Sequence, residues 1–112
     1  METSPPNLSV IVAERDYSKS YSTPDLRIKV LNQGGSEATI AKVFLLQTGS
    51  GGGYYYPSSP VTIYPLSTAW VTVLLDFDPP TPGYFGYTGP MACQLMDSSG
   101  NVLYSTNDLK YN

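Results

Sequence analysis

The segment Asp97-Ser-Ser-Gly-Asn101 contains the residue types that could bind a hard cation. Carboxylate, hydroxyl and amide oxygens in a tight loop are the ligands that calcium prefers. The segment carries only one carboxylate, and no glutamate follows it to complete a calcium loop. The alternative is a hairpin turn in which Asp97 accepts hydrogen bonds from nearby backbone N–H groups. We favour the turn, and we therefore predict no metal ligands and no cofactor.

Catalytic side chains are scarce. The chain has no histidine, so the commonest general base near neutral pH is missing. Asp76 and Asp78 could act as paired carboxylates, but two acids flanking Phe77 more simply mark the point where a strand leaves the core. Neither a Gly-x-Ser-x-Gly motif, a phosphate-binding loop nor a Cys/His metal spacing occurs. The sequence therefore predicts a protein without catalytic residues that is not an enzyme.

Cys93 is the single cysteine and cannot form a disulfide within the chain. It lies in Met91-Ala-Cys-Gln-Leu-Met96, in phase with the apolar residues Met91 and Leu95. This phase favours a buried small hydrophobic side chain over a reactive thiol.

Three consecutive tyrosines provide the best indication of a binding site. Tyr54, Tyr55 and Tyr56 follow the glycine-rich loop 48–53. Aromatic rings on a loop can stack on a sugar or anchor a protein partner, because each ring offers a large apolar area with a polar tip. In the alternative, the tyrosines alternate, with one packing inward and the others lying over the edge of the fold. Both interpretations stay open from the sequence.

The elements that position these residues are short strands. Ten glycines, ten prolines and ten tyrosines favour strands and turns over helices. Leu26, Ile28 and Val30 alternate with less apolar residues, as in a strand with one buried face. The other expected strands are 7–14 (with Leu8, Val10 and Val12 on one side), 38–46, 60–64, 69–77, 84–87 with 91–96, and 102–106. We predict an all-β, immunoglobulin-like antiparallel β-sandwich of seven to eight strands.

One domain is expected. A chain of 112 residues leaves no room for two good cores. Residues 7–112 are predicted to form the domain, and 1–6 a disordered or artificially added N-terminus. The abrupt, polar start would suit a chain from which a preceding membrane helix had been removed, so a membrane is expected only through a helix absent from this chain.

Strand phases predict an interface. If Ala41, Val43 and Leu45 face the core, Phe44 and Leu46 point outward. Likewise, inward-facing Val71, Val73, Leu75 and Phe77 would leave Trp70 and Leu74 outside. Large adjacent exposed apolar side chains mark interfaces, although a bulge that reverses the phase would bury them. The predicted interface consists of Phe44, Leu46, Trp70, Leu74 and Met96, with Ala92 beside Met96.

The stretch Leu26–Leu46, with its Asn-x-Gly-x-x-x-Ala pattern, resembles the start of CARDB-type and related immunoglobulin-like modules of prokaryotic, especially archaeal, cell surfaces. The segments Val61–Val73 and Pro82-Gly-Tyr84 continue the resemblance, which covers roughly 26–106. It implies an extracytoplasmic domain at the cell surface or in the pseudoperiplasm. Soluble domains of archaellum accessory and pilin-like proteins look similar in size and composition.

Charge limits the partners. The net charge is −3 and Lys and Arg do not cluster, so binding to nucleic acid is not expected. We expect a non-enzymatic structural or protein-interaction module for surface assembly, which forms a homo-oligomer or docks to a surface-layer or filament protein. The alternative is a carbohydrate-binding module in which the tyrosine loop and Trp70 stack on a glycan. The glycosylation triplet Asn7-Leu-Ser9 supports a surface location only weakly.

Overall fold

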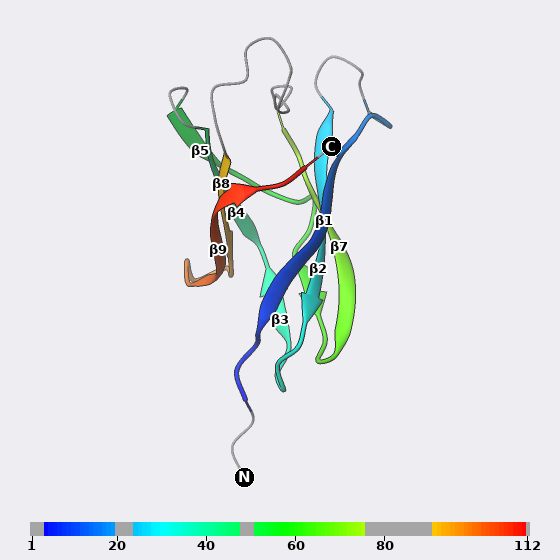
Figure 1. Ribbon diagram of the computed structural model, residues 1–112, viewed down its shortest axis with the longest axis vertical. Coiled ribbons are helices and arrows are strands. Elements are labelled where there is room, and N and C mark those ends of the chain that lie inside the picture. The colour runs from blue at the N-terminus through cyan, green and yellow to red at the C-terminus, as the bar shows by residue number, and fades with distance from the viewer. Residues whose placement is uncertain (1–3, 20–23, 48–50, 76–90, 112) are drawn as a thin grey trace.

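A computed structural model describes residues 4–19, 24–47, 51–75 and 91–111. The described residues form nine strands and no helix: β1 (Leu8–Asp16), β2 (Asp25–Asn32), β3 (Ala38–Ile40), β4 (Lys42–Gln47), β5 (Gly51–Tyr55), β6 (Val61–Ile63), β7 (Ser67–Val73), β8 (Met91–Met96) and β9 (Val102–Leu109). All their pairings are antiparallel. One sheet has the order β1-β2-β7, another β5-β4-β8-β9, and β3 pairs with β6 alone (Figure 1).

The two larger sheets share one hydrophobic core. Buried residues of β1, β2 and β7 belong to the same cluster as buried residues of β4, β8 and β9. Because each sheet buries one face against the other, the predicted all-β antiparallel sandwich is confirmed. Nine strands are found where seven to eight were expected, and the expected strand 84–87 lies outside the described residues. The immunoglobulin-like topology stays a prediction.

Strand β2 lies at the centre of its sheet. Leu26, Ile28 and Val30 are fully buried, as the alternation predicts. Polar side chains hold both ends of this strand. At its start, buried Asp25 accepts hydrogen bonds through Oδ1 from Lys19 Nζ (2.8 Å) and from the backbone N–H of Leu75 (3.3 Å). At its end, buried Asn32 makes four hydrogen bonds.

Strand β1 differs from the expected phase. Its pairing with β2 shifts between Val10 and Val12, so that a bulge includes Ile11. An extra residue reverses the alternation. Ala13 is therefore buried opposite Ile28, whereas Val12 pairs with Lys29 and is only half-buried. The expectation that Leu8, Val10 and Val12 share one side was wrong at Val12.

The expected strand 38–46 is divided. Residues Ala38–Ile40 pair with β6, whereas Lys42–Gln47 pair with β5 and β8. Ala41 lies between them and donates its N–H to the carbonyl of Met96 (2.9 Å). The chain changes partners at this residue, so Ile40 and Val43 are both buried while Ala41 is only half-buried. The inward position expected for Ala41 was therefore wrong, whereas those of Val43 and Leu45 are confirmed.

Strand β5 was expected to be part of a loop. Glycine is unfavourable in strands and typical of loops, yet Gly51, Gly52 and Gly53 pair with Gln47, Leu46 and Leu45. A side chain at Gly52 would lie 2.8 Å from the Leu45 carbonyl oxygen and 2.9 Å from Leu46 Cδ1. The absence of side chains thus permits a close approach of β5 to β4. Tyr54 and Tyr55 are strand residues as a consequence.

Candidate functional site

The outer face of the β5-β4-β8-β9 sheet carries the most apolar exposed surface that can be assigned to one sheet. Directly paired residues share a face, and the pairings place Phe44 beside Tyr54 and Gln94, Leu46 beside Gly52 and Ala92, and Gln94 beside Ser105. Buried Val43, Leu45, Cys93 and Leu95 occupy the opposite face. The outer face thus consists of Lys42, Phe44, Leu46, Gly52, Tyr54, Ala92, Gln94 and Ser105, and we refer to it as the outer face below.

Large side chains gather on one half of this face. Tyr54 is 53% exposed and Leu46 39% exposed. The rings of Phe44 and Tyr54 lie with centroids 5.2 Å apart and their planes tilted by 53°. Lys42 Nζ lies 4.8 Å from the centre of the Tyr54 ring, a cation–π contact worth about 0.5 to 1 kcal/mol at an exposed position. The outward positions predicted for Phe44 and Leu46 agree with this geometry.

Met96 does not contribute to an exposed patch. Its partner in β4 is Lys42, but its side chain is only 7% exposed. The pairing of β8 with β9 shifts between Leu95 and Met96. A bulge bends and twists a strand locally, so a side chain can be covered where strict alternation predicts an exposed one. Met96 is thus a buried residue and not a surface contact.

Trp70 and Leu74 lie on the other side of the sandwich. Trp70 is 40% exposed and pairs with Lys29 of β2. The guanidinium of Arg27 lies 4.6 Å from the centre of the Trp70 ring and Lys29 Nζ lies 5.8 Å from it. Arg27 also forms an ion pair with Glu14. Trp70 is outward as predicted, but charged side chains surround it, so this face is less apolar than the outer face.

The three tyrosines alternate. Tyr54 lies on the outer face, Tyr55 pairs with Val43 and packs against the core, and Tyr56 is exposed beyond the end of β5. Their place in and next to a strand corrects the expectation of a binding loop 54–56. Trp70 and Tyr54 belong to different sheets. The structure therefore does not bring them together into one stacking platform.

Residues 97–101 form a hairpin turn between β8 and β9. Asp97 Oδ1 accepts hydrogen bonds from the backbone N–H groups of Ser99 and Asn101 (2.9 Å each), and its Oδ2 accepts one from Asn101 Nδ2 (3.0 Å). Gly100 has a φ of 88°, which glycine adopts readily. The bonds from Asn101 above all lower the pKa of the Asp97 carboxyl below its usual range. The turn predicted from the sequence is confirmed.

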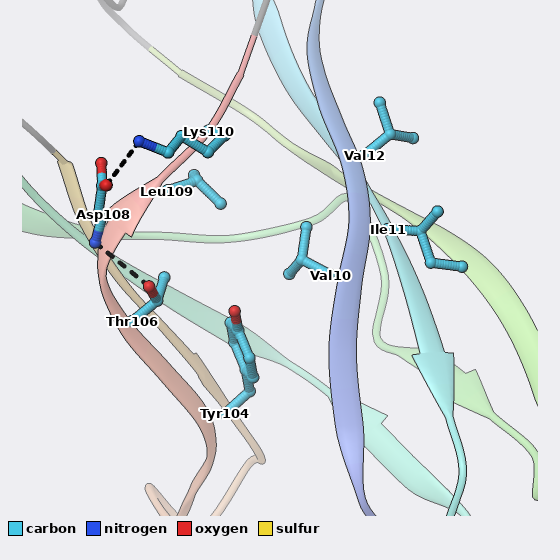
Figure 2. A pocket seen from close by; sticks show the side chains of 8 residues that line it. All are labelled: Val10, Ile11, Val12, Tyr104, Thr106, Asp108, Leu109 and Lys110. Atoms are coloured by element: carbon cyan, nitrogen blue, oxygen red, sulfur yellow. Dashed lines mark hydrogen bonds and ion pairs between the residues drawn. The ribbon is translucent and has the colours of Figure 1, made fainter.

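A hollow of about 200 Å³ lies between the edge strands β1 and β9 (Figure 2). It is lined by Val10, Ile11, Val12, Tyr104, Thr106, Asp108, Leu109 and Lys110. Its charged residues Asp108 and Lys110 form an ion pair with each other (2.6 Å). Within residues 4–19, 24–47, 51–75 and 91–111, no group of three or more His, Cys, Asp or Glu residues is placed to hold a metal. Asp76 and Asp78 lie outside the described residues.

Neither a protein-family model, a curated protein nor a solved structure matches this chain. No helix long and apolar enough to cross a membrane is found in the part of the chain that the structure describes. The arrangement of side chains on the outer face therefore carries the functional argument.

Sequence reasoning missed one exposed residue. Leu66 is 80% exposed and has a φ of 57°. Ser67 donates its N–H to the carbonyl of Tyr64 (3.2 Å), so Pro65 and Leu66 occupy the two central positions of a type II turn. The third position of such a turn favours glycine. The Tyr-Pro-Leu-Ser order signals a turn, but the leucine gives no sign of its positive φ.

Cys93 is fully buried, and burial raises the pKa of its thiol to about 12. In the unfolded chain the pKa of a thiol is about 8.5. Because the folded thiol has the higher pKa, the unfolded chain loses its proton first as the pH rises. This contribution to stability is therefore intact below about pH 8.5 and is lost progressively up to about pH 12.

We expect the free energy of unfolding of the wild type to fall relative to that of Cys93→Ala by about 2 kcal/mol at pH 10. Urea unfolding of both proteins between pH 7 and 10 measures this difference. Ionisation of tyrosine and lysine is common to both proteins and cancels in the comparison. A difference between the two proteins that does not change with pH would contradict the expectation.

Proposed function

We propose that this protein is a non-enzymatic extracytoplasmic module of immunoglobulin-like fold that serves in cell-surface assembly. It binds protein, either a second copy of itself or a surface-layer or filament subunit, through the outer face. Its role is mechanical: apolar side chains of Phe44, Leu46 and Tyr54 become buried against the partner and hold the assembly together.

The strand order supports the immunoglobulin-like part of the proposal. In that topology the first, second and fifth strands share one sheet, and the third, sixth and seventh share the other. The sheet orders β1-β2-β7 and β4-β8-β9 correspond to these two sets, if β3 and β6 are counted as extensions of neighbouring strands. The low charged fraction, 13% of the residues, suits a module that is covered by partners over part of its surface.

The observation that carries the proposal is the continuous outer face. Phe44, Leu46 and Tyr54 are neighbours on adjacent strands. A fully exposed apolar side chain contributes little, whereas burying it in an interface contributes about 1.5 to 3 kcal/mol. Three such side chains on one flat sheet face are the type of patch that marks a protein interface.

The carbohydrate alternative has less support. A glycan platform needs exposed aromatic rings in one plane with polar neighbours. The rings of Phe44 and Tyr54 are tilted by 53°, and Arg27 lies over the Trp70 ring in the other sheet. Gln94 next to Phe44 is the one polar neighbour that favours a sugar.

Sedimentation velocity over a hundredfold range of concentration, at neutral and acidic pH, tests the proposal. We expect reversible self-association of the wild type and weaker association of Leu46→Asp, by at least about tenfold in the dissociation constant. A carboxylate at position 46 would have to lose its hydration in the interface, and this cost disfavours association.

Leu66→Asp is the matched control. It makes the same chemical change at a more exposed leucine, in the turn between β6 and β7. We expect this variant to associate as the wild type does. A wild type that remains monomeric at every concentration, or equal association of both variants, would count against the outer face as the binding surface.

A further inference from the structure

The outer face has a high half and a low half. Strands β4 and β5 carry the large side chains Phe44, Leu46 and Tyr54, whereas β8 and β9 carry Ala92, Gln94 and Ser105 at the paired positions. The boundary between the halves runs along the strands, between β4 and β8, which are neighbours in the middle of the sheet. The face is therefore uneven in a regular way.

Charge at one end of the face is also arranged in two halves. Lys42 lies on β4, and its partner in β8 is Met96, which is followed directly by Asp97. Lys42 contacts the Tyr54 ring, and no carboxylate among the described residues forms an ion pair with it. The carboxylate of Asp97 is bonded only within its own turn. A cation on the high half thus lies next to an anion on the low half.

We propose that the occupant of the outer face is a second copy of this chain, bound as a twofold-symmetric dimer whose axis runs parallel to the strands over the boundary between β4 and β8. This inference rests on the proposed function. A twofold contact uses the same surface on both copies, so the surface must be complementary to itself. Rotation about this axis places the high half of each copy on the low half of the other.

The rotation fixes which residues meet. It places Leu46 opposite Ala92 of the other copy and Tyr54 opposite Ser105, because β4 lies over β8 and β5 over β9. Lys42 comes to the end of the other copy's β8, where Asp97 begins the turn. The same contacts occur twice by symmetry. Charge complementarity and side-chain size therefore agree on one arrangement.

The other twofold axis that would bring the two faces together gives poorer contacts. An axis in the plane of the sheet but perpendicular to the strands places β4 over β4 and Lys42 over the end that carries Leu46. Large side chains would then meet large ones, and the lysine would have no carboxylate opposite it. Aligned packing of sheets at about 30° is also the commoner mode in sandwiches, and the parallel axis provides it.

The size of the face predicts a weak dimer. Four strands spaced by about 4.8 Å and five residues rising by about 3.3 Å each define roughly 300 Å² per copy. Both copies together bury far less than the roughly 1,200 Å² that is the lower limit for a stable complex. We therefore expect a dissociation constant of micromolar order or weaker, and rapid exchange between monomer and dimer.

Cross-linking between single-cysteine variants tests the arrangement. Leu46→Cys and Ala92→Cys are prepared separately, mixed, and treated with a short bis-maleimide whose reach matches the roughly 10 Å between packed sheets. Buried Cys93 is not expected to react in the folded chain. We expect a cross-linked dimer in the mixture and very little in either variant alone, and the same result for Tyr54→Cys mixed with Ser105→Cys.

Sedimentation of the same variants separates the possible failures. If the variants associate but Leu46→Cys alone is cross-linked as well as the mixture, this dimer is wrong while protein binding by the face stands. If the wild type does not associate at any concentration, both the dimer and the self-association in the proposed function fail. Gln94→Trp provides a second measurement, because a large side chain on the low half is expected to abolish the dimer, whereas Gln94→Ala is expected to retain it.

Discussion

Replacing Asn32 with alanine is expected to lower the free energy of unfolding by about 4 kcal/mol. Asn32 is fully buried at the end of β2. Its Oδ1 accepts hydrogen bonds from the backbone N–H groups of Asn7 (3.2 Å) and Gly34 (2.9 Å). Its Nδ2 donates to the carbonyl oxygens of Ser36 (2.8 Å) and Ile63 (3.0 Å). One side chain thus joins the start of β1, the turn after β2 and the end of β6.

Alanine would leave these partners without a hydrogen bond. The N–H of Gly34 and the carbonyl of Ile63 are in buried bonds, and each buried group left unsatisfied costs about 1 to 3 kcal/mol. Urea unfolding followed by the fluorescence of Trp70, the single tryptophan, measures the loss. Gln33→Ala, at the exposed neighbouring position, is the control and should change stability by less than about 0.5 kcal/mol. A loss below about 1 kcal/mol for Asn32→Ala would show that water replaces the amide.

The second large effect is expected for Gly34→Ala, with a loss of about 3 kcal/mol. A Cβ atom at Gly34 would lie 2.1 Å from the carbonyl oxygen of Pro5, 2.7 Å from the nitrogen of Asn7 and 2.8 Å from Cα of Pro6. All three are backbone atoms, so no side-chain rotation relieves the overlap. The segment before β1 would have to move away and give up the bond from Gln33 N–H to the Asn7 carbonyl (2.8 Å).

Gly53→Ala is the matched control for this substitution. Its Cβ would lie 3.4 Å from the hydroxyl oxygen of Tyr55, the end of a flexible side chain, and alanine is better suited than glycine to a strand. We expect this variant to be as stable as the wild type or slightly more stable, by up to about 1 kcal/mol. Equal destabilisation by both substitutions would mean that the close approach at Gly34 does not limit the fold.

The two substitutions also test whether this end of the molecule acts as one unit. Asn32 and Gly34 share a hydrogen bond and both hold the segment before β1. Residues that share a network are not additive. We therefore expect the double variant to lose less stability than the sum of the single losses. The outer face lies on the other sheet, so the association of stable copies should be unaffected.

Alternation was sufficient to predict the strands that have one buried face. Leu26, Ile28 and Val30 are fully buried, as are Val71 and Val73. Polar and apolar residues at a period of two leave only one way to bury the apolar side. The hairpin turn at Asp97 was also predictable, because aspartate bonds its own neighbouring backbone in any fold. The outward positions of Phe44, Leu46 and Trp70 follow from the same alternation.

Contacts between distant residues decided the rest. The bulge at Ile11, the change of partner at Ala41 and the covered position of Met96 depend on which strand lies alongside. The glycines of β5 became a strand because β4 offers unpaired backbone groups that they can approach closely. Local preference in these segments is weak, so pairing energy determines the result.

The sequence by itself therefore determined that this chain is an all-β protein, that Cys93 and the residues in phase with it belong to the core, and that Phe44, Leu46 and Trp70 lie outside. Only the tertiary structure decided which outward residues are neighbours. It placed Tyr54 with Phe44 on one sheet, and it placed Trp70 on the other sheet beside Arg27. The physical reason is that periodicity assigns a side chain to a face, whereas the neighbours on that face depend on strand order and register, which are set by contacts far apart in the chain.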